Sequence, residues 1–419
     1  MLLQFLIFVL LPLLAFLYFK FLHISLPSEI QDKGVLRFMH LLNTIFVLVP
    51  FRLLDHFNAP PHYKVAWMKL MTKGMKHMAI LGAPACKDVG QFDTKYDGVT
   101  VRVYLPAPQI KSSTLKGSII WIHGGGWMVG SLDQYDATCR RVVQLMGMPV
   151  VSIDYSLTPT VRFPTAVDEC EKAVIYHLQH GAHALHVDAS RTVLMGDSAG
   201  GNLTAVVAHR LAKRRKTGLD VPQLKATVPL YPCIQCADLC LPCYQQEKTT
   251  GIGILPTNVM HLFHLEYFAI PAAKGVFEKL SRNEHLGDVV KQNAAFQWIN
   301  KKHLPEEWQT ESHITDLKPS GKLDRELASK MAKFITDPDF SPIFAKDFSD
   351  IPPTMVITCG YDVLRDEGAM YAKRLESEGV STVWKHYPET FHGIISAPTP
   401  TSNKIMGDIF QFVKDNLQE

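Results

Sequence analysis

The stretch Val193–Gly200 reads Val-Leu-Met-Gly-Asp-Ser-Ala-Gly, and it gives the clearest indication of the fold. Three apolar residues of the kind found in a buried strand lead into a pentad with glycines two residues before and after Ser198, and the helix-forming segment Ala199–Lys213 follows. A serine in this strand–turn–helix setting is the pattern of a nucleophile elbow. The glycines are needed because the turn is sharp and a β-carbon there would clash. The start of the helix would also direct N–H groups toward negative charge that develops near Ser198.

Short apolar runs on both sides of this stretch are typical of strands that are buried on both faces. They are Ser118–His123, Val150–Tyr155, Ala226–Tyr231, Met355–Cys359 and the strand-like Thr382–Tyr387. Helix-like segments alternate with them, namely Tyr135–Met146, Ala166–His180, Glu367–Glu378 and Lys404–Leu417. A hairpin formed by Phe92–Tyr96 and Thr100–Leu105 comes before them. Alternating strands and helices predict an α/β fold with a parallel sheet covered on both faces.

A second glycine-rich run directly follows one of these expected strands. His123, Gly124, Gly125 and Gly126 stand in succession, and consecutive glycines let a loop turn its N–H groups inward. Such donors hold the oxyanion of a tetrahedral intermediate, and the N–H of Ala199, the residue after the serine, would complete the set. A phosphate-binding loop is the alternative, but a P-loop ends in Gly-Lys-Ser or Gly-Lys-Thr and this run does not. We therefore predict an oxyanion hole built from residues 123–126 and Ala199.

A nucleophilic serine needs an acid and a base farther along the chain, in the order serine, acid, histidine. Asp362 and His392 each follow an expected strand. At the strand ends His392 would take the serine proton, and Asp362 would fix the imidazole tautomer. Asp366 is a rival acid, but it falls where the next helix begins, and a carboxylate there acts as a cap. The predicted catalytic residues are Ser198, Asp362 and His392.

These motifs together resemble the hormone-sensitive-lipase branch of the α/β hydrolases. The likeness rests on His-Gly-Gly-Gly-Trp at residues 123–127, Gly-Asp-Ser-Ala-Gly-Gly at 196–201, Asp-x-Leu-x-Asp-Glu at 362–367 and Phe-His-Gly at 391–393. With the chain length and the apolar N-terminus it narrows to the arylacetamide deacetylase-like group. The resemblance implies a mostly parallel eight-stranded sheet with a helical cap, hydrolysis of carboxylic esters or aryl amides, and a catalytic body in the lumen of the endoplasmic reticulum.

Two regions interrupt the alternation of strands and helices. Residues 233–337 are long, rich in charge and in helix-like segments such as Asn258–Phe268, and we interpret them as an insertion between two strands. With residues 23–90 they would cap the edge of the sheet at which ligands bind in open α/β folds. We therefore divide the chain into an anchor at 1–22, an N-terminal cap segment at 23–90, core residues at 91–232, a cap insertion at 233–337 and further core residues at 338–419.

The N-terminus departs from a soluble pattern. Met1–Phe19 holds no charged side chain, and the run through Leu22 approaches the ~20 residues that cross a hydrocarbon core. A signal peptide would have a basic start and a small-residue cleavage site, so we favour an uncleaved anchor through residues 2–22 over a signal peptide or a buried helix. Lys20 and Lys33 favour a cytoplasmic body. The resemblance implies a lumenal one, and we follow it and expect a single-pass type II membrane protein.

A second apolar stretch, Val35–Leu54, follows the expected anchor. Two arginines, an asparagine and a proline interrupt it, so a second full span is disfavoured. We expect a helix of the core or the cap there. A face that rests on a membrane is the alternative, because amphipathic interfacial helices have this pattern.

Four of the eight cysteines are crowded between Cys233 and Cys243 as Cys-x-x-Cys-x-x-x-Cys-x-x-Cys. Structural zinc sites separate their cysteine pairs by roughly 12–20 residues, so metal binding is disfavoured. In an oxidising lumen we expect disulfides, with the pairing left open and Cys86 as one candidate partner. The remaining three fall on strand or helix patterns and are expected to be buried thiols: Cys139, Cys170 and Cys359.

Composition narrows the classes of function. The chain has 419 residues, 47% hydrophobic and 20% charged, which is a globular composition. A net charge of +3 supplies no concentrated positive charge for nucleic acid. We therefore expect a membrane-anchored serine hydrolase that cleaves small apolar esters or amides without a metal or organic cofactor, and the oligomeric state stays open. The alternative is a catalytically silent hydrolase fold that binds a small molecule, but such a protein would lack the serine or the histidine, and this chain keeps both.

Overall fold

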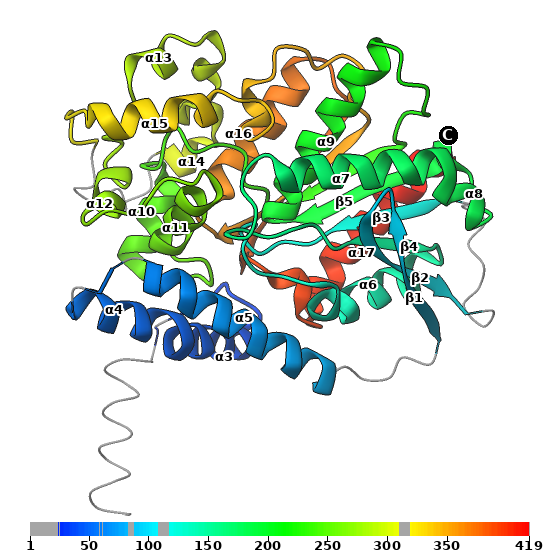
Figure 1. Cartoon of the computed structure of the whole chain (residues 1–419), viewed down its shortest axis with the longest axis horizontal. Coiled ribbons are helices and arrows are strands. Elements are labelled where there is room, and N and C mark those ends of the chain that lie inside the picture. The colour runs from blue at the N-terminus through cyan, green and yellow to red at the C-terminus, as the bar shows by residue number, and fades with distance from the viewer. Residues whose placement is uncertain are drawn as a thin grey trace, which may run out of the picture.

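The computed structural model describes residues 24, 26–57, 59, 60, 62–82, 88–107, 117–309 and 319–418. At its centre lies one sheet of eight strands: β1 (Val89–Tyr96), β2 (Val99–Pro106), β3 (Ser118–Ile122), β4 (Val150–Ile153), β5 (Thr192–Asp197), β6 (Ala226–Leu230), β7 (Thr354–Tyr361) and β8 (Thr382–Phe391). Their order is β1-β2-β4-β3-β5-β6-β7-β8 (Figure 1). β2 pairs antiparallel with both β1 and β4, and the remaining strands are parallel. The sheet is therefore mostly parallel, as the alternating pattern predicts.

Helices cover both faces of the sheet (Figure 1). One face carries α6 (Leu132–Met146) and α17 (Pro400–Gln418), and the other carries α7 (Thr165–Tyr176), α9 (Ala199–Lys216) and α16 (Arg365–Ser377). Successive side chains of a strand point to opposite faces, so each face has its own core. In β3, Ile119 and Trp121 belong to the core under α6, whereas Ile120 and Ile122 belong to the core under α9. All five β3 residues are buried, and the four after Ser118 are apolar, as expected of a strand covered on both faces.

Two further helical regions lie beside the sheet. Near the N-terminus, α3 (Lys33–Asn43), a π-helical turn (Thr44–Leu48) and α4 (Val49–His56) form one continuous helix, and α5 (His62–Gly82) follows. Between β6 and β7 lie α10 (Pro242–Thr250), α11 (Thr257–Tyr267), α12 (Val276–Leu280), α13 (Asp288–Lys291), α14 (Glu306–Gln309) and α15 (Arg325–Ile335). The N-terminal helices, blue in Figure 1, lie beside α10, α11 and α12.

The predicted strands all form, and the α/β prediction is confirmed. β7 and β8 are longer than expected because Tyr361 still pairs with Phe391 after an irregularity in the register. The predicted helix Ala166–His180 ends as an α-helix at Tyr176 and continues as a π-helical turn, His177–Gly181. The predicted anchor at residues 2–22 lies outside the described residues. Within the described ranges, Lys33–His56 is one helix with the length and apolar composition to cross a bilayer.

The seven described cysteines are buried free thiols, so the expected disulfides are wrong for them, and Cys86 lies outside the described residues. Three of the four sulfurs in the cluster have separate polar neighbours: Cys233 Sγ lies 3.5 Å from His264 Nε2, and the thiols of Cys240 and Cys243 donate at 2.9 Å to the carbonyls of Ser281 and Val363. Because they face different groups, these sulfurs do not pair. The described residues hold no group of three His, Cys, Asp or Glu side chains that could bind a metal ion.

Candidate active site

The sharp turn predicted between strand and helix is present at Ser198, where φ is 58° and ψ is −121°. A positive φ is strained for a residue with a side chain, so the surroundings must impose it. The N–H of Ser198 donates to the carbonyl of Leu230 on the neighbouring strand at 2.9 Å. A β-carbon on Gly196 would lie 2.6 Å from the carbonyl oxygen of Ile122, and one on Gly200 would lie closer still to that oxygen. Glycine is therefore required at both positions.

The three predicted catalytic side chains meet at the ends of their strands. His392, the residue after β8, has Nε2 at 2.9 Å from Ser198 Oγ and Nδ1 at 2.8 Å from Asp362 Oδ2. Asp362, the residue after β7, also accepts the N–H of Leu364 at Oδ1, at 2.9 Å. The hydrogen bonds to Nδ1 and from the backbone fix the imidazole and the carboxylate in one orientation. Ser198, Asp362 and His392 are all buried, with 8%, 5% and 8% of their surfaces exposed, which leaves the serine and the imidazole narrowly open.

Asp366, the rival acid, faces other groups. It lies in the first turn of α16, where its carboxylate accepts the N–H of Cys243 at 2.9 Å and Nε of Arg365 at 2.8 Å. Its role is to tie the start of α16 to the chain segment that follows β6.

A second serine–histidine contact lies at the other end of the parallel strands, where they begin. Ser118 Oγ lies 2.8 Å from His177 Nε2 and 3.1 Å from Thr192 Oγ1, and all three side chains are fully buried. Ser118 and Thr192 face each other where β3 and β5 begin. Burial lowers the pKa of His177 to about 4, so the imidazole is neutral at pH 7. The third member is a hydroxyl rather than a carboxylate, and the serine backbone is ordinary strand.

The glycine run after β3 is tied to the elbow by a carboxylate. Asp197, the residue before the serine, accepts the N–H of Gly124 at Oδ1 (3.0 Å) and the hydroxyl of Tyr135 at Oδ2 (2.9 Å). The N–H of Gly124 also lies 3.1 Å from the oxygen of Tyr135. Within the described residues, the N–H groups of Gly125 and Gly126 donate to no protein acceptor.

This tie is the part of the site that the sequence analysis missed. Burial raises the pKa of Asp197 to about 6, while the hydrogen bond from Tyr135 holds it down. The signal in the sequence was the aspartate inside the Gly-x-Ser-x-Gly pentad. Tyr135 lies on α6, and no local pattern connects it to residue 197. His123, the first residue of the run, donates from Nδ1 to the carbonyl of Gly124 at 2.8 Å and is fully buried.

Aromatic side chains from the region between β6 and β7 close over the glycine run. A β-carbon on Gly126 would overlap the ring of Phe263 on α11, so helix and loop are in direct contact. Trp127, the next residue, stacks on Tyr267 with ring centres 4.6 Å apart and planes 3° apart. Phe340 packs against both Trp127 and Tyr267. The wall beside the free N–H groups is therefore apolar and aromatic.

Comparison with known proteins finds related chains. A family model described as alpha/beta hydrolase fold matches residues 119–280 and 299–396. Neutral cholesterol ester hydrolase 1 of Bos taurus is 33% identical over 405 residues, which cover 94% of both chains. Arylacetamide deacetylase of Oryctolagus cuniculus is 34% identical over 331 residues, which cover 78% of this chain and 80% of that one. A solved structure of a hyperthermophilic esterase from the archaeon Pyrobaculum calidifontis matches with a TM-score of 0.60 and 26% identity, over 83% of this chain and 93% of that one.

Proposed function

The chain belongs to the α/β-hydrolase family as a serine hydrolase of the esterase and deacetylase type, and on this premise we propose that Ser198, His392 and Asp362 are its catalytic triad. The observation that carries the proposal is the continuous path of two hydrogen bonds, from Ser198 Oγ through the imidazole to the carboxylate. A silent binding protein is disfavoured, because this path sits at a strained serine whose geometry has no purpose in simple binding.

The reaction follows from this geometry. As Ser198 Oγ bonds to the substrate carbonyl carbon, His392 Nε2 takes the serine proton, and Asp362 stabilises the imidazolium. The tetrahedral intermediate collapses when its C–O or C–N bond breaks, and His392 returns the proton to the leaving alcohol or amine. Water then attacks the acyl-enzyme while His392 takes its proton. The acid leaves, and Ser198 Oγ recovers a proton.

We assign the oxyanion to N–H groups that donate to no acceptor within the described ranges. Gly125, Gly126 and Ala199 supply these donors in our proposal, because the N–H of Gly124 is already bound to Asp197. Gly124 and His123 then shape the loop that presents the donors. Donors aimed in advance at developing charge commonly supply the largest electrostatic part of the rate enhancement in acyl transfer.

We propose small apolar esters or aryl amides as substrates. The aromatic wall of Phe263, Trp127 and Tyr267 beside the glycine run supports an apolar acyl or alcohol group. The names of two relatives, arylacetamide deacetylase and neutral cholesterol ester hydrolase 1, also support apolar amides or esters as substrates. In this proposal residues 233–337, which supply Phe263 and Tyr267 to this wall, and residues 23–90 act as the cap.

We also propose that residues 2–22 anchor the chain in the endoplasmic-reticulum membrane, with the catalytic body in the lumen. The charge-free run Met1–Phe19 and the resemblance to arylacetamide deacetylase-like proteins support this placement. Protease treatment of sealed microsomes tests it. The body should resist digestion until detergent is added, and digestion without detergent would contradict the lumenal placement.

Labelling with a fluorophosphonate probe tests the triad. We expect the wild-type protein and the control Ser118→Ala, which keeps Ser198, to be labelled covalently. Ser198→Ala should lose the label. Ser118→Ala is a matched control, because it removes the other serine that contacts a histidine. Labelling of Ser198→Ala at the wild-type level would remove the proposal.

A further inference from the structure

Exposed apolar side chains are concentrated on the N-terminal helices. Of the thirteen large apolar residues that are exposed in the described ranges, nine lie between residues 38 and 70. We call these nine the α3–α5 face: Phe38, Leu42, Ile45, Phe46, Val49, Leu53, Phe57, Tyr63 and Leu70. Scattered exposed apolar residues are normal on a protein surface, whereas a contiguous group marks a site of interaction.

The opposite side of the same helices is packed against the body. Leu36 is fully buried in the core under α6, and Phe51 and Val65 belong to the core under α9. Nε1 of Trp67 on α5 donates to the carbonyl of Phe46 at 2.6 Å, which ties α5 to the π-helical turn. Although Lys33–His56 is long and apolar enough to cross a bilayer, its packed side keeps it lying along the surface of the body.

A groove between α4 and α5 adds apolar volume to this face. It encloses about 430 Å³ and is lined by apolar side chains that include Leu53, Leu54, Trp67 and Leu70. Its volume and lining suit hydrocarbon chains. The nearby aromatic side chains, Trp67 and half-exposed Tyr63, are of the kind enriched at membrane–water interfaces.

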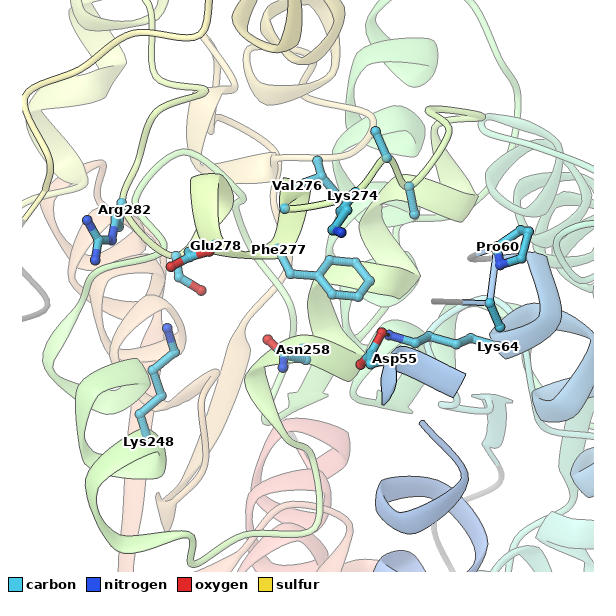
Figure 2. A pocket seen from close by; sticks show the side chains of 15 residues that line it. Asp55, Pro60, Lys64, Lys248, Asn258, Lys274, Val276, Phe277, Glu278 and Arg282 are labelled. Carbon is cyan, nitrogen blue, oxygen red and sulfur yellow. Dashed lines mark ion pairs between the residues drawn. The ribbon is translucent and has the colours of Figure 1, made fainter. Parts of the chain in front are cut away.

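Positive charge adjoins the α3–α5 face. A pocket of about 780 Å³ lies where the turn between α4 and α5 meets α12, and Figure 2 shows its charged lining. Four cations, Lys64, Lys248, Lys274 and Arg282, line it with two acids. Asp55, one of the acids, is already paired with Lys64 at 2.7 Å. With that pair neutral, the cations Lys248, Lys274 and Arg282 outnumber Glu278, so the lining carries a net positive charge that favours an anion.

We propose that the α3–α5 face rests on a phospholipid bilayer with anionic headgroups. Its apolar side chains would lie about 5–10 Å into the boundary between headgroups and acyl chains, as in other interfacial helices, and the basic pocket would face the headgroup phosphates. Exposed Arg37, Arg52 and Lys69 on the same helices add to the complementary charge. The inference deepens the proposed function, on which it rests, because a body held against the leaflet takes apolar esters directly from it.

Carbene footprinting of the full chain tests this docking. The protein is reconstituted into vesicles of phosphatidylcholine with or without phosphatidylserine, and modified residues are read by mass spectrometry. We expect Phe38, Phe46 and Phe57 to lose modification in vesicles, most strongly with phosphatidylserine. Phe92 and Val289, exposed apolar residues elsewhere, should stay modified. Equal modification of both groups would overturn the proposal.

Other occupants of the face give different results, and each contradicts the bilayer. A second copy of the chain would protect the face in proportion to protein concentration. Residues 1–23 of the same chain would protect it equally with and without vesicles. Turnover of a soluble short-chain ester in the same samples distinguishes failure of the docking proposal from failure of the proposed catalytic function. A protein that hydrolyses this ester while its α3–α5 face stays modified would contradict the docking alone.

Two sets of glutamine substitutions give a second readout. Phe38→Gln, Phe46→Gln, Leu53→Gln and Phe57→Gln together should slow hydrolysis of an ester embedded in vesicles and leave the soluble ester unaffected. The matched control combines Phe92→Gln, Val289→Gln and Leu323→Gln and should change neither rate. Phosphatidylserine should raise the rate of hydrolysis of the embedded ester, and Arg282→Gln should reduce this increase by about fivefold. A surface cation near an anionic leaflet has roughly that effect. An equal loss of rate on the embedded and the soluble ester would contradict the proposal. An equal loss of rate in the face variant and the control variant would contradict it too.

Discussion

The Ser198–His392 pair and the Ser118–His177 pair join the same two kinds of atom at nearly the same distance, 2.9 and 2.8 Å. They lie at opposite ends of the parallel strands. Ser198 follows the carboxyl end of β5 in a strained turn, and Ser118 begins β3 in extended backbone. Among the described residues, a carboxylate orients the first histidine and not the second, and N–H groups without a protein acceptor lie beside the first serine. The distance is nearly the same in both pairs, so our proposal of Ser198 as the nucleophile rests on the elbow, the acid and the N–H donors instead.

The strongest loss of activity should come from replacing the acid that orients His392. Asp362→Asn should lower kcat/KM by about 10⁴-fold, because the imidazole loses its orienting and charge-stabilising partner. Thr192→Val makes the matching change in the second pair and should leave kcat/KM unchanged. Steady-state kinetics on a soluble ester measure both. A small effect of Asp362→Asn would contradict the assigned acid.

A smaller effect is expected from the tie between the elbow and the glycine run. Tyr135→Phe removes a donor that lowers the pKa of Asp197, so this pKa rises above about 6. The carboxylate then gains its proton at higher pH and loses its bond to the Gly124 N–H, which shifts the acid limb of kcat/KM to higher pH. We expect about a tenfold loss at pH 7, consistent with losing one hydrogen bond to a charged group.

A pH profile between 5 and 9 measures this change. Tyr244→Phe is the control, because its buried hydroxyl has no hydrogen-bond partner within the described part of the chain. An unshifted acid limb in Tyr135→Phe would show that Asp197 does not control the loop.

The smallest catalytic effect is expected for the second pair, whose loss should be visible in stability alone. Ser118→Ala leaves buried groups of His177 and Thr192 without a partner, which costs about 1–3 kcal/mol of unfolding free energy. Denaturant unfolding at pH 7 measures it, and kcat/KM should stay at the wild-type value. A loss of activity in the folded variant would contradict a purely structural role for Ser118.

The same pair predicts how stability depends on pH. The pKa of His177 is lowered to about 4 in the folded protein, so the unfolded chain binds more protons below its ordinary value of 6.5. The contribution of His177 is present above pH 6.5 and is lost as the pH falls from 6.5 toward 4.

The sequence could predict what is local. The elbow is one continuous segment, and the positions of Asp362 and His392 followed from strands that end just before them. The tie between Asp197 and Tyr135 could not be predicted, because it joins a turn to a helix through tertiary packing. The disulfide prediction failed because it rested on an expected compartment, whereas the folded chain leaves the described thiols free and directs those of Cys233, Cys240 and Cys243 to separate neighbours.

The character of Val35–Leu54 could not be fixed by its residue pattern either. An interrupted apolar run fits a core helix and an interfacial helix equally well. In the structure the two sides of this helix differ in burial. Leu36 and Phe51 are buried, whereas Phe38 and Leu53 on the same helix are exposed.

The crowded thiols between Cys233 and Cys243 can report local opening of the folded chain through their reaction with an alkylating reagent. Burial raises their pKa values, so an alkylating reagent meets unreactive, inaccessible sulfur as long as the chain stays closed. Mass added by such a reagent over hours then counts the openings of the segment after β6. That segment leads into α10 and α11. The alkylation rate measured with a bound inhibitor would therefore show whether occupancy of the site slows the opening of these helices.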